Sequence, residues 1–178
     1  MNYQILKTKT TPANYRVNIE WEYLEGTIES YLNKKLAPLN IDPDFQRGHV
    51  WTEAQQIAYL EFKFSGSSGS NEIQLNCPGW MNDFRGPFEL VDGKQRLNAV
   101  LKFLKNEIKI FGYLRKEIEG RIPSYCEFVF HINNLSNRYD VLKWYIELNS
   151  GGTPHTQEEL NKVKKLIEKE EKSAWTLN

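Results

Sequence analysis

Apolar residues along this chain follow two periods, one expected of amphipathic helices and one expected of β-strands. The helical spacing predicts helices over about residues 21–35, 53–64, 94–106, 137–149 and 157–168. A glycine at position 26 weakens the first of these helices without preventing it. The helical pattern therefore extends over much of the chain.

Short apolar or alternating runs predict the strands. Residues 1–20 are expected to form an extended arm or an edge strand, and further strands are expected over 72–75, 88–91, 108–111 and 125–132. The run 125–132 alternates most clearly, with Cys126, Phe128, Phe130 and Ile132 on one face. This alternation predicts a half-buried strand.

Capping and loop signals set the boundaries of these elements. Thr52 and Thr156 each open a capping-box pattern, and Ser136 is expected to cap the helix that ends at Asn149. Glycine and serine over 65–70 predict a flexible connection or a mobile lid. This loop is not a phosphate-binding P-loop, because no Gly-Lys-Ser/Thr follows it.

The length of 178 residues fits one domain with a substantial core. We expect an arm over 1–20, a domain over 21–155, and a helix over 156–178 that packs on the same domain. The 23 basic and 23 acidic residues cancel, which argues against a protein that binds nucleic acid with its whole surface. A local basic face remains compatible with this balance.

Cysteine usage and hydropathy indicate the compartment. Cys77 and Cys126 lie far apart without a Cys-x-x-Cys pattern, so neither a zinc site nor a disulfide framework is predicted. The first residues lack the features of a signal peptide, and no apolar run approaches the length needed to span a bilayer. We expect a soluble, cytoplasmic protein without a membrane partner.

The stretch 88–100 is the strongest candidate for chemistry. It reads as a short strand, an Asp92-Gly93 turn and a helix, with Lys94, Gln95 and Arg96 at the start of the helix. A turn that leads into a helix N-terminus leaves backbone N–H groups unpaired beside the positive end of the helix dipole. The stretch therefore predicts an anion or phosphate cradle. The alternative is that Asp92 only caps the helix and that the cations are solvated surface charges.

Two further polar clusters accompany this turn. Gln46-Arg47 follows Pro43, and Asn149 is followed by Ser150, Gly151, Gly152 and Thr153. An arginine can bind phosphate oxygens with two hydrogen bonds, and a Gly-Gly-Thr turn offers backbone donors and a hydroxyl. Together the three clusters would form one pocket, although their spacing alone does not show that they meet.

Other chemistries have weaker support. Pro43-Asp44 followed by Glu61-Phe62-Lys63 superficially matches a metal-nuclease pattern, but that chemistry needs the second motif on a strand, and this one falls on a predicted helix. The histidines at 49, 131 and 155 are isolated in the sequence, which disfavours an H-N-H type nuclease site. Nothing basic adjoins Cys77, and Cys126 lies on a strand face expected to be buried, so a nucleophilic cysteine is not supported.

The three clusters in this order resemble the N-terminal domain of GmrSD-type modification-dependent restriction endonucleases, in the ParB/sulfiredoxin-like superfamily. The resemblance covers about residues 20–168 and is greatest to short stand-alone members carried by phages and prophages. The family's Asp-Gly-Gln-Gln-Arg (DGQQR) motif corresponds to residues 92–96, where Lys94 departs from the usual glutamine. The cysteine that the sulfiredoxin branch requires at its phosphate turn is missing near Asp92.

The resemblance implies an α+β, ParB-like fold: a small mixed sheet packed with helices, with a C-terminal helical pair. It also implies a pocket for a nucleoside triphosphate (NTP), whose hydrolysis is coupled in several relatives to DNA restriction. The restriction enzymes continue into a separate H-N-H nuclease domain, which we do not expect in this sequence.

On this basis we expect NTP binding and hydrolysis with Mg²⁺, in a DNA-directed process such as restriction, phage defence or counter-defence. Arg47, Lys94 and Arg96 would clamp the phosphates, Gln46 or Gln95 would orient the attacking water, and Asp92 would bind the metal or fix the turn. The further phosphate-binding candidates are Gly93, Asn149, Gly151, Gly152 and Thr153. One alternative is a non-catalytic module that uses the same pocket to bind DNA or a partner such as a separate nuclease or effector protein. Another alternative is a DNA-nicking nuclease.

Overall fold

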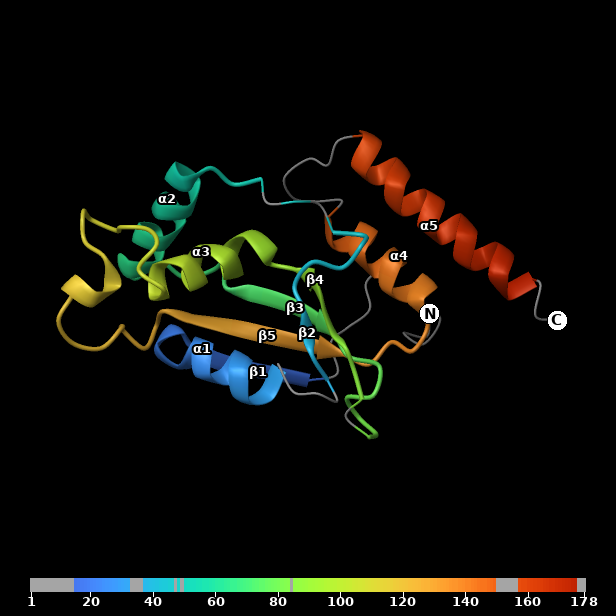
Figure 1. Cartoon of the computed structure of the whole chain (residues 1–178), viewed down its shortest axis with the longest axis horizontal. Coiled ribbons are helices and arrows are strands. Elements are labelled where there is room, and N and C mark those ends of the chain that lie inside the picture. Colours follow the sequence, from blue (N-terminus) through green and yellow to red (C-terminus); the bar gives the residue numbers. More distant parts are fainter. Residues whose placement is uncertain are drawn as a thin grey trace, which may run out of the picture.

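The computed structural model describes residues 15–32, 37–46, 48, 50–83, 85–149 and 157–175. Helices and strands are interspersed along the chain up to β5, and two helices follow it (Figure 1). In chain order they are β1 (Tyr15–Glu20), α1 (Leu24–Thr27), β2 (Leu39–Asn40), α2 (Glu53–Phe64), β3 (Glu72–Asn76), β4 (Phe88–Asp92), α3 (Lys94–Leu104), β5 (Glu127–Asn133), α4 (Arg138–Asn149) and α5 (Gln157–Trp175).

The five strands form one mixed sheet in the order β1-β5-β3-β4-β2. β5 pairs antiparallel with β1 and parallel with β3, while β4 pairs antiparallel with β3 and parallel with β2. A small mixed sheet packed with helices, followed by two C-terminal helices, confirms the expected α+β fold class. β1 lies at an edge of the sheet, as expected for the end of the N-terminal segment.

Two hydrophobic cores lie on the two faces of the sheet. Leu90 and Val91 are neighbours on β4, but Leu90 packs in a core with α2 and α3, and Val91 packs in a core with α4 and α5. Side chains alternate across a strand, so adjacent apolar residues reach opposite faces. Figure 1 shows α4 and α5 side by side in opposite directions at one end of the molecule. Each fully buried large apolar side chain contributes about 1.5–3 kcal/mol by leaving water.

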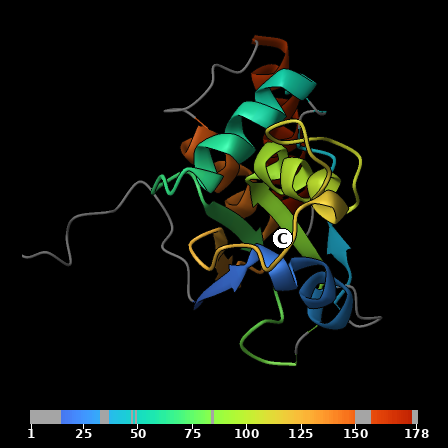
Figure 2. The same cartoon turned by 90° about the vertical axis from the view of Figure 1, so that its left-hand side faces the viewer.

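The predicted helix over 21–35 is confirmed as a helical path over 21–32, but its pitch changes twice. It comprises a 3₁₀ turn over Trp21–Tyr23, then α1, then a π-helical turn over Ile28–Leu32. Gly26 lies in the middle of this path and lowers its helix propensity. Trp21 and Leu24 are fully buried, so packing holds this irregular path. Figure 2 shows α1 and β1 (blue) on the opposite side of the molecule from α2 (teal).

The predicted strand over 108–111 is wrong. Ile110 forms only an isolated bridge with Tyr113, because the chain reverses through positive φ angles at Phe111 (48°) and Gly112 (85°). Ile108 and Ile110 are buried in the core. These two side chains therefore anchor a loop in the core, and the segment does not extend the sheet.

The capping predictions have different outcomes. The Thr52 hydroxyl accepts from the backbone N–H of Gln55, whose side chain accepts from the backbone N–H of Thr52, so this capping box is confirmed. Ser136 does not take the cap position of α4, because Asn137 precedes the helix and its Oδ1 accepts from Tyr139 N at 2.9 Å. Thr156 lies outside the described residues. Among the described helices, none has the length and apolar composition required to cross a bilayer.

Candidate functional site

The turn between β4 and α3 depends on Gly93. This residue has a φ of +100° and takes the N-cap position of α3. A Cβ atom at this position would lie 2.5 Å from Cδ1 of Ile73 and 3.1 Å from the carbonyl oxygen of Glu72. Glycine is therefore required both by the backbone conformation and by the close approach of β3. The cap position belongs to Gly93, so Asp92 is not the N-cap of α3.

Asp92 and Arg96 form an ion pair one turn apart. Arg96 Nη2 donates to Asp92 Oδ2 at 2.7 Å and to the carbonyl oxygen of Glu72 at 2.9 Å. The Arg96 side chain is 22% exposed. Among the described residues, its buried Nε has no hydrogen-bond partner. Arg96 thus joins α3 to β3 and β4, and its charge is partly neutralised by Asp92.

Lys94 is nearly buried and connects α3 to the segment that follows β2. Its side chain is 8% exposed, and Nζ donates to Asp42 Oδ1 at 2.5 Å. Asp42 itself is 72% exposed. The prediction of Lys94 as a solvated surface charge is therefore wrong.

Gln46 and Gln95 hold residues 42–46 and 50–51 against the turn. Gln46 is buried, and its Nε2 donates to the carbonyl oxygens of Leu90 and Val91, both at 2.8 Å. Gln95 Oε1 accepts from the backbone N–H groups of Val50 and Trp51, both at 3.2 Å. Two of the three predicted clusters, Gln46 and Asp92 to Arg96, therefore lie side by side.

A second ionic cluster fixes the same segment from the side of α4. Arg138 contacts Asp44 and Glu89, and its Nε lies 3.8 Å from Glu170 Oε1 on α5. Its guanidinium carbon lies 5.8 Å from the ring centre of Phe45. Burial raises the pKa of the Glu89 carboxyl, and the nearby Arg138 charge partly opposes this shift. Arg138 thereby joins β4, α5 and the segment around Phe45.

A pocket of about 190 Å³ opens beside this segment. It is lined by Phe45, Gln46, Gly48, Tyr145, Glu159 and Lys162. The rings of Phe45 and Tyr145 lie 5.2 Å apart. This volume is below the roughly 300–1,000 Å³ typical of small-molecule sites, so the described residues would enclose only part of a nucleotide.

The third predicted cluster is described only at its first residue. Asn149 ends α4, and its Nδ2 donates to the carbonyl oxygen of Tyr145 at 2.8 Å. Asn149 is therefore one helical turn beyond a residue that lines the pocket. Arg47, together with Gly151, Gly152 and Thr153, lies outside the described residues.

Residues that the sequence did not single out complete the arrangement. Asp42 pairs with Lys94, Arg138 joins three acidic residues, and Lys162 on α5 lines the pocket together with Glu159, the last residue of the predicted capping box. The sequence contains no local signal for Lys162, because it resembles the other charged residues of α5.

The expected metal site has little support among the residues that the structure describes. No group of three or more His, Cys, Asp or Glu side chains there could hold a metal ion. Asp92, the expected ligand, is paired with Arg96. Mg²⁺ in phosphate sites commonly uses only one or two carboxylates together with phosphate oxygens and water. Asp92 therefore fits a metal only if a bound phosphate supplies most of the other ligands.

The alternative nuclease pattern is not assembled. Glu61 and Lys63 lie on α2, as predicted. Lys63 is buried and donates to the carbonyl oxygens of Ser67 and Gly69, while Glu61 Oε1 accepts from Phe111 N at 2.7 Å. These contacts stabilise the glycine-serine loop and the loop around Phe111.

His131 and the two cysteines, which the structure describes, give no further catalytic site. His131 is not isolated in space, since its Nε2 contacts Glu72 Oε2. The histidines at 49 and 155 lie outside the described residues. Cys77 and Cys126 are free, fully buried thiols, and burial raises the pKa of Cys126 to about 11. A raised thiol pKa disfavours the reactive thiolate at neutral pH.

Comparison with known proteins gives no matching family model, no matching curated protein and no matching solved structure. The resemblance carried by the three motifs therefore stays a prediction. The fold class and the geometry around the Asp-Gly turn rest on the structure alone.

Proposed function

We propose that this protein binds a nucleoside triphosphate in the pocket that Phe45, Gln46 and Gly48 form with the C-terminal helical pair, with its phosphates reaching toward the Asp92-Gly93 turn. The proposal includes hydrolysis of the nucleotide in a DNA-directed process such as restriction, phage defence or counter-defence. It is supported by the motif resemblance to the GmrSD-type, ParB-like domain.

The observation that carries the proposal is the set of side-chain contacts around the turn. Gln46, Lys94 and Gln95 each connect residues 42–46 or 50–51 to the β4–α3 junction, and the pocket opens beside Gln46. Separate polar motifs that meet beside a helix N-terminus are the arrangement that a phosphate site needs.

Phosphate binding at the turn would require an exchange of partners. Lys94 would leave Asp42 for a phosphate oxygen, and Arg96 would share its charge between Asp92 and the ligand. Asp42 is 72% exposed, so its pair with Lys94 is screened by solvent and contributes at most about 1 kcal/mol. A charged hydrogen bond to phosphate readily offsets the free energy lost when this pair breaks.

The competition between Asp42 and a phosphate for Lys94 provides a test of the proposal. Asp42→Asn removes the carboxylate that holds Lys94, and we expect it to tighten binding of Mg²⁺–ATP or Mg²⁺–GTP by up to about fivefold. Lys94→Gln should weaken binding. Affinity is measured by calorimetry and hydrolysis by phosphate release, with folding checked by circular dichroism. If none of a panel of the common ribonucleoside triphosphates binds the unmodified protein, the proposal is wrong.

A second candidate function is binding without hydrolysis, as a module that contacts DNA or a protein partner. It is favoured by one observation. Gln46 and Gln95, one of which is expected to orient the attacking water, already bond to the backbone through the Gln46 amide nitrogen and the Gln95 side-chain oxygen. Salt-sensitive gel shifts of plain or modified DNA without phosphate release would favour this candidate.

A further inference from the structure

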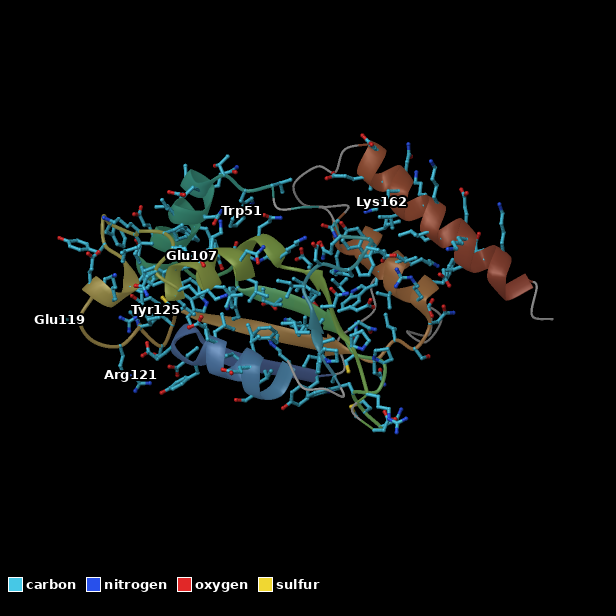
Figure 3. The ribbon with its side chains drawn as sticks, in the orientation of Figure 1. Trp51, Glu107, Glu119, Arg121, Tyr125 and Lys162 are labelled. Carbon is cyan, nitrogen blue, oxygen red and sulfur yellow. The ribbon has the colours of Figure 1, made fainter. Side chains whose placement is uncertain are left out.

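Lys162 lies on the C-terminal helix, outside the motifs that the sequence analysis selected. It is an exposed residue of α5 that lines the pocket opposite the segment of Phe45 and Gln46. Figure 3 labels Lys162 near the start of α5, on the side of the helix that faces α4. Its position is set by packing, because the adjacent Val163 is buried against α4.

The described cations at the start of α3 and at the start of α4 are held by acidic side chains. Lys94 pairs with Asp42, Arg96 with Asp92, and Arg138 with three carboxylates. In the described part of the chain, Lys162 forms no ion pair and is the only cation among the residues that line the pocket. A cation without an acidic partner can bind an anion without first breaking a pair.

The remaining lining residues complement such a cation. Phe45 and Tyr145 provide an aromatic wall, and Gln46 provides an amide. Glu159 lies three residues before Lys162, on the same side of α5, and also lines the pocket. Its carboxylate opposes the binding of a bare anion, so the two residues should affect phosphate affinity with opposite signs.

We propose that Lys162 binds a phosphate group of the ligand in this pocket. The C-terminal helix would then be part of the binding site, and the negative charge of the ligand would be met first by Lys162. This inference rests on the proposed function, since it needs a phosphate-bearing ligand in the same pocket.

The test compares two variants of α5 in the full chain. Lys162→Gln should weaken binding of ATP and GTP about tenfold, the loss expected for one charged hydrogen bond. The matched control is Lys164→Gln, which makes the same change at an exposed lysine of the same helix outside the pocket lining. We expect the control to bind as the unmodified protein does.

Inorganic tripolyphosphate in EDTA isolates the contact to phosphate. Lys162→Gln should weaken its binding, and Glu159→Gln should tighten it by up to about fivefold, because the repelling carboxylate is removed. If Lys162→Gln weakens nucleotide binding but not tripolyphosphate binding, the contact is not to phosphate and the inference is wrong. Equal losses in Lys162→Gln and Lys164→Gln would also overturn it.

The two proposals can fail separately. If the unmodified protein binds no triphosphate, the proposed function fails and the role of Lys162 fails with it. If the unmodified protein binds and Lys162→Gln binds equally well, only the role of Lys162 fails. Circular dichroism of each variant separates a lost contact from a lost fold.

Discussion

Replacing Gly93 with alanine tests the geometry on which the candidate site depends. The added Cβ would occupy a residue with φ of +100° and lie 2.5 Å from Cδ1 of Ile73. The left-handed backbone costs an L-residue about 1–2 kcal/mol, and overpacking of a core costs about 1–3 kcal/mol. We therefore expect Gly93→Ala to lower the free energy of unfolding by about 2–5 kcal/mol.

A control variant separates the cost of the left-handed backbone from the cost of overpacking. Gly120 has a similar φ of +86°, but no atom lies within 4 Å of the position of its Cβ. Gly120→Ala should therefore show the backbone cost alone, about 1–2 kcal/mol. The assay is urea unfolding, in which a lower midpoint at an unchanged slope reports a loss of stability.

A double-mutant cycle identifies the contact itself. Ile73→Val removes the Cδ1 atom that the new Cβ would meet, and alone it should cost about 0.5–1.5 kcal/mol. In the double variant the clash is relieved, so the combined loss should be smaller than the sum of the single losses. If Gly93→Ala costs no more than Gly120→Ala, or if the two changes are additive, the close approach of β3 does not explain the glycine.

Two further predictions concern ionisable groups that are partly or fully buried. Burial raises the pKa of Glu89, so the folded protein holds this proton more tightly than the unfolded chain does. The stability that the proton provides is complete below the unfolded pKa, near 4.3, and is lost as the pH rises through the folded pKa. Glu89→Gln should therefore gain stability relative to the unmodified protein as the pH rises above about 4.3, and a difference in denaturant unfolding that does not change with pH would contradict this reasoning. Burial also raises the pKa of both thiols, to about 11 for Cys126, so an aromatic disulfide reagent at pH 8 should modify Cys77 and Cys126 only after unfolding. Rapid reaction of either thiol in the native protein would contradict their burial.

The motif resemblance and the structure bear on different questions. The resemblance supplies the expectation of a nucleotide site and of a DNA-directed role. The structure shows that the basic residues of the DGQQR-like motif already have acidic partners, Asp42 for Lys94 and Asp92 for Arg96. A ligand that binds Lys94 or Arg96 must therefore compete with these partners. The Asp42→Asn variant measures that competition, whereas Lys162→Gln tests a lysine that forms no ion pair among the described residues.

Sequence alone was sufficient where the interactions are local. The capping box at Thr52, the glycine turn at Gly93 and the end of α4 at Asn149 were all predicted, because each depends on residues a few positions apart. The prediction of a strand over 108–111 was wrong because apolar alternation does not reveal whether a neighbouring strand is available. The cap of α4 was misplaced by one residue, since Ser136 and Asn137 are both good caps.

Tertiary structure decided which charges meet. Asp42 and Lys94 are 52 residues apart, and Asp44 and Arg138 are 94 apart, so no local pattern links them. The pocket combines Phe45, Gln46 and Gly48 with residues of α4 and α5, and Lys162 lines it because the adjacent Val163 packs against α4. The sequence by itself thus determined the helices, most of the strands and the Asp-Gly turn, because backbone preferences and side-chain periodicity act over a few residues. Only the packing of the sheet between its two cores decided which charges are neutralised and which face the pocket, because that depends on how distant segments approach one another.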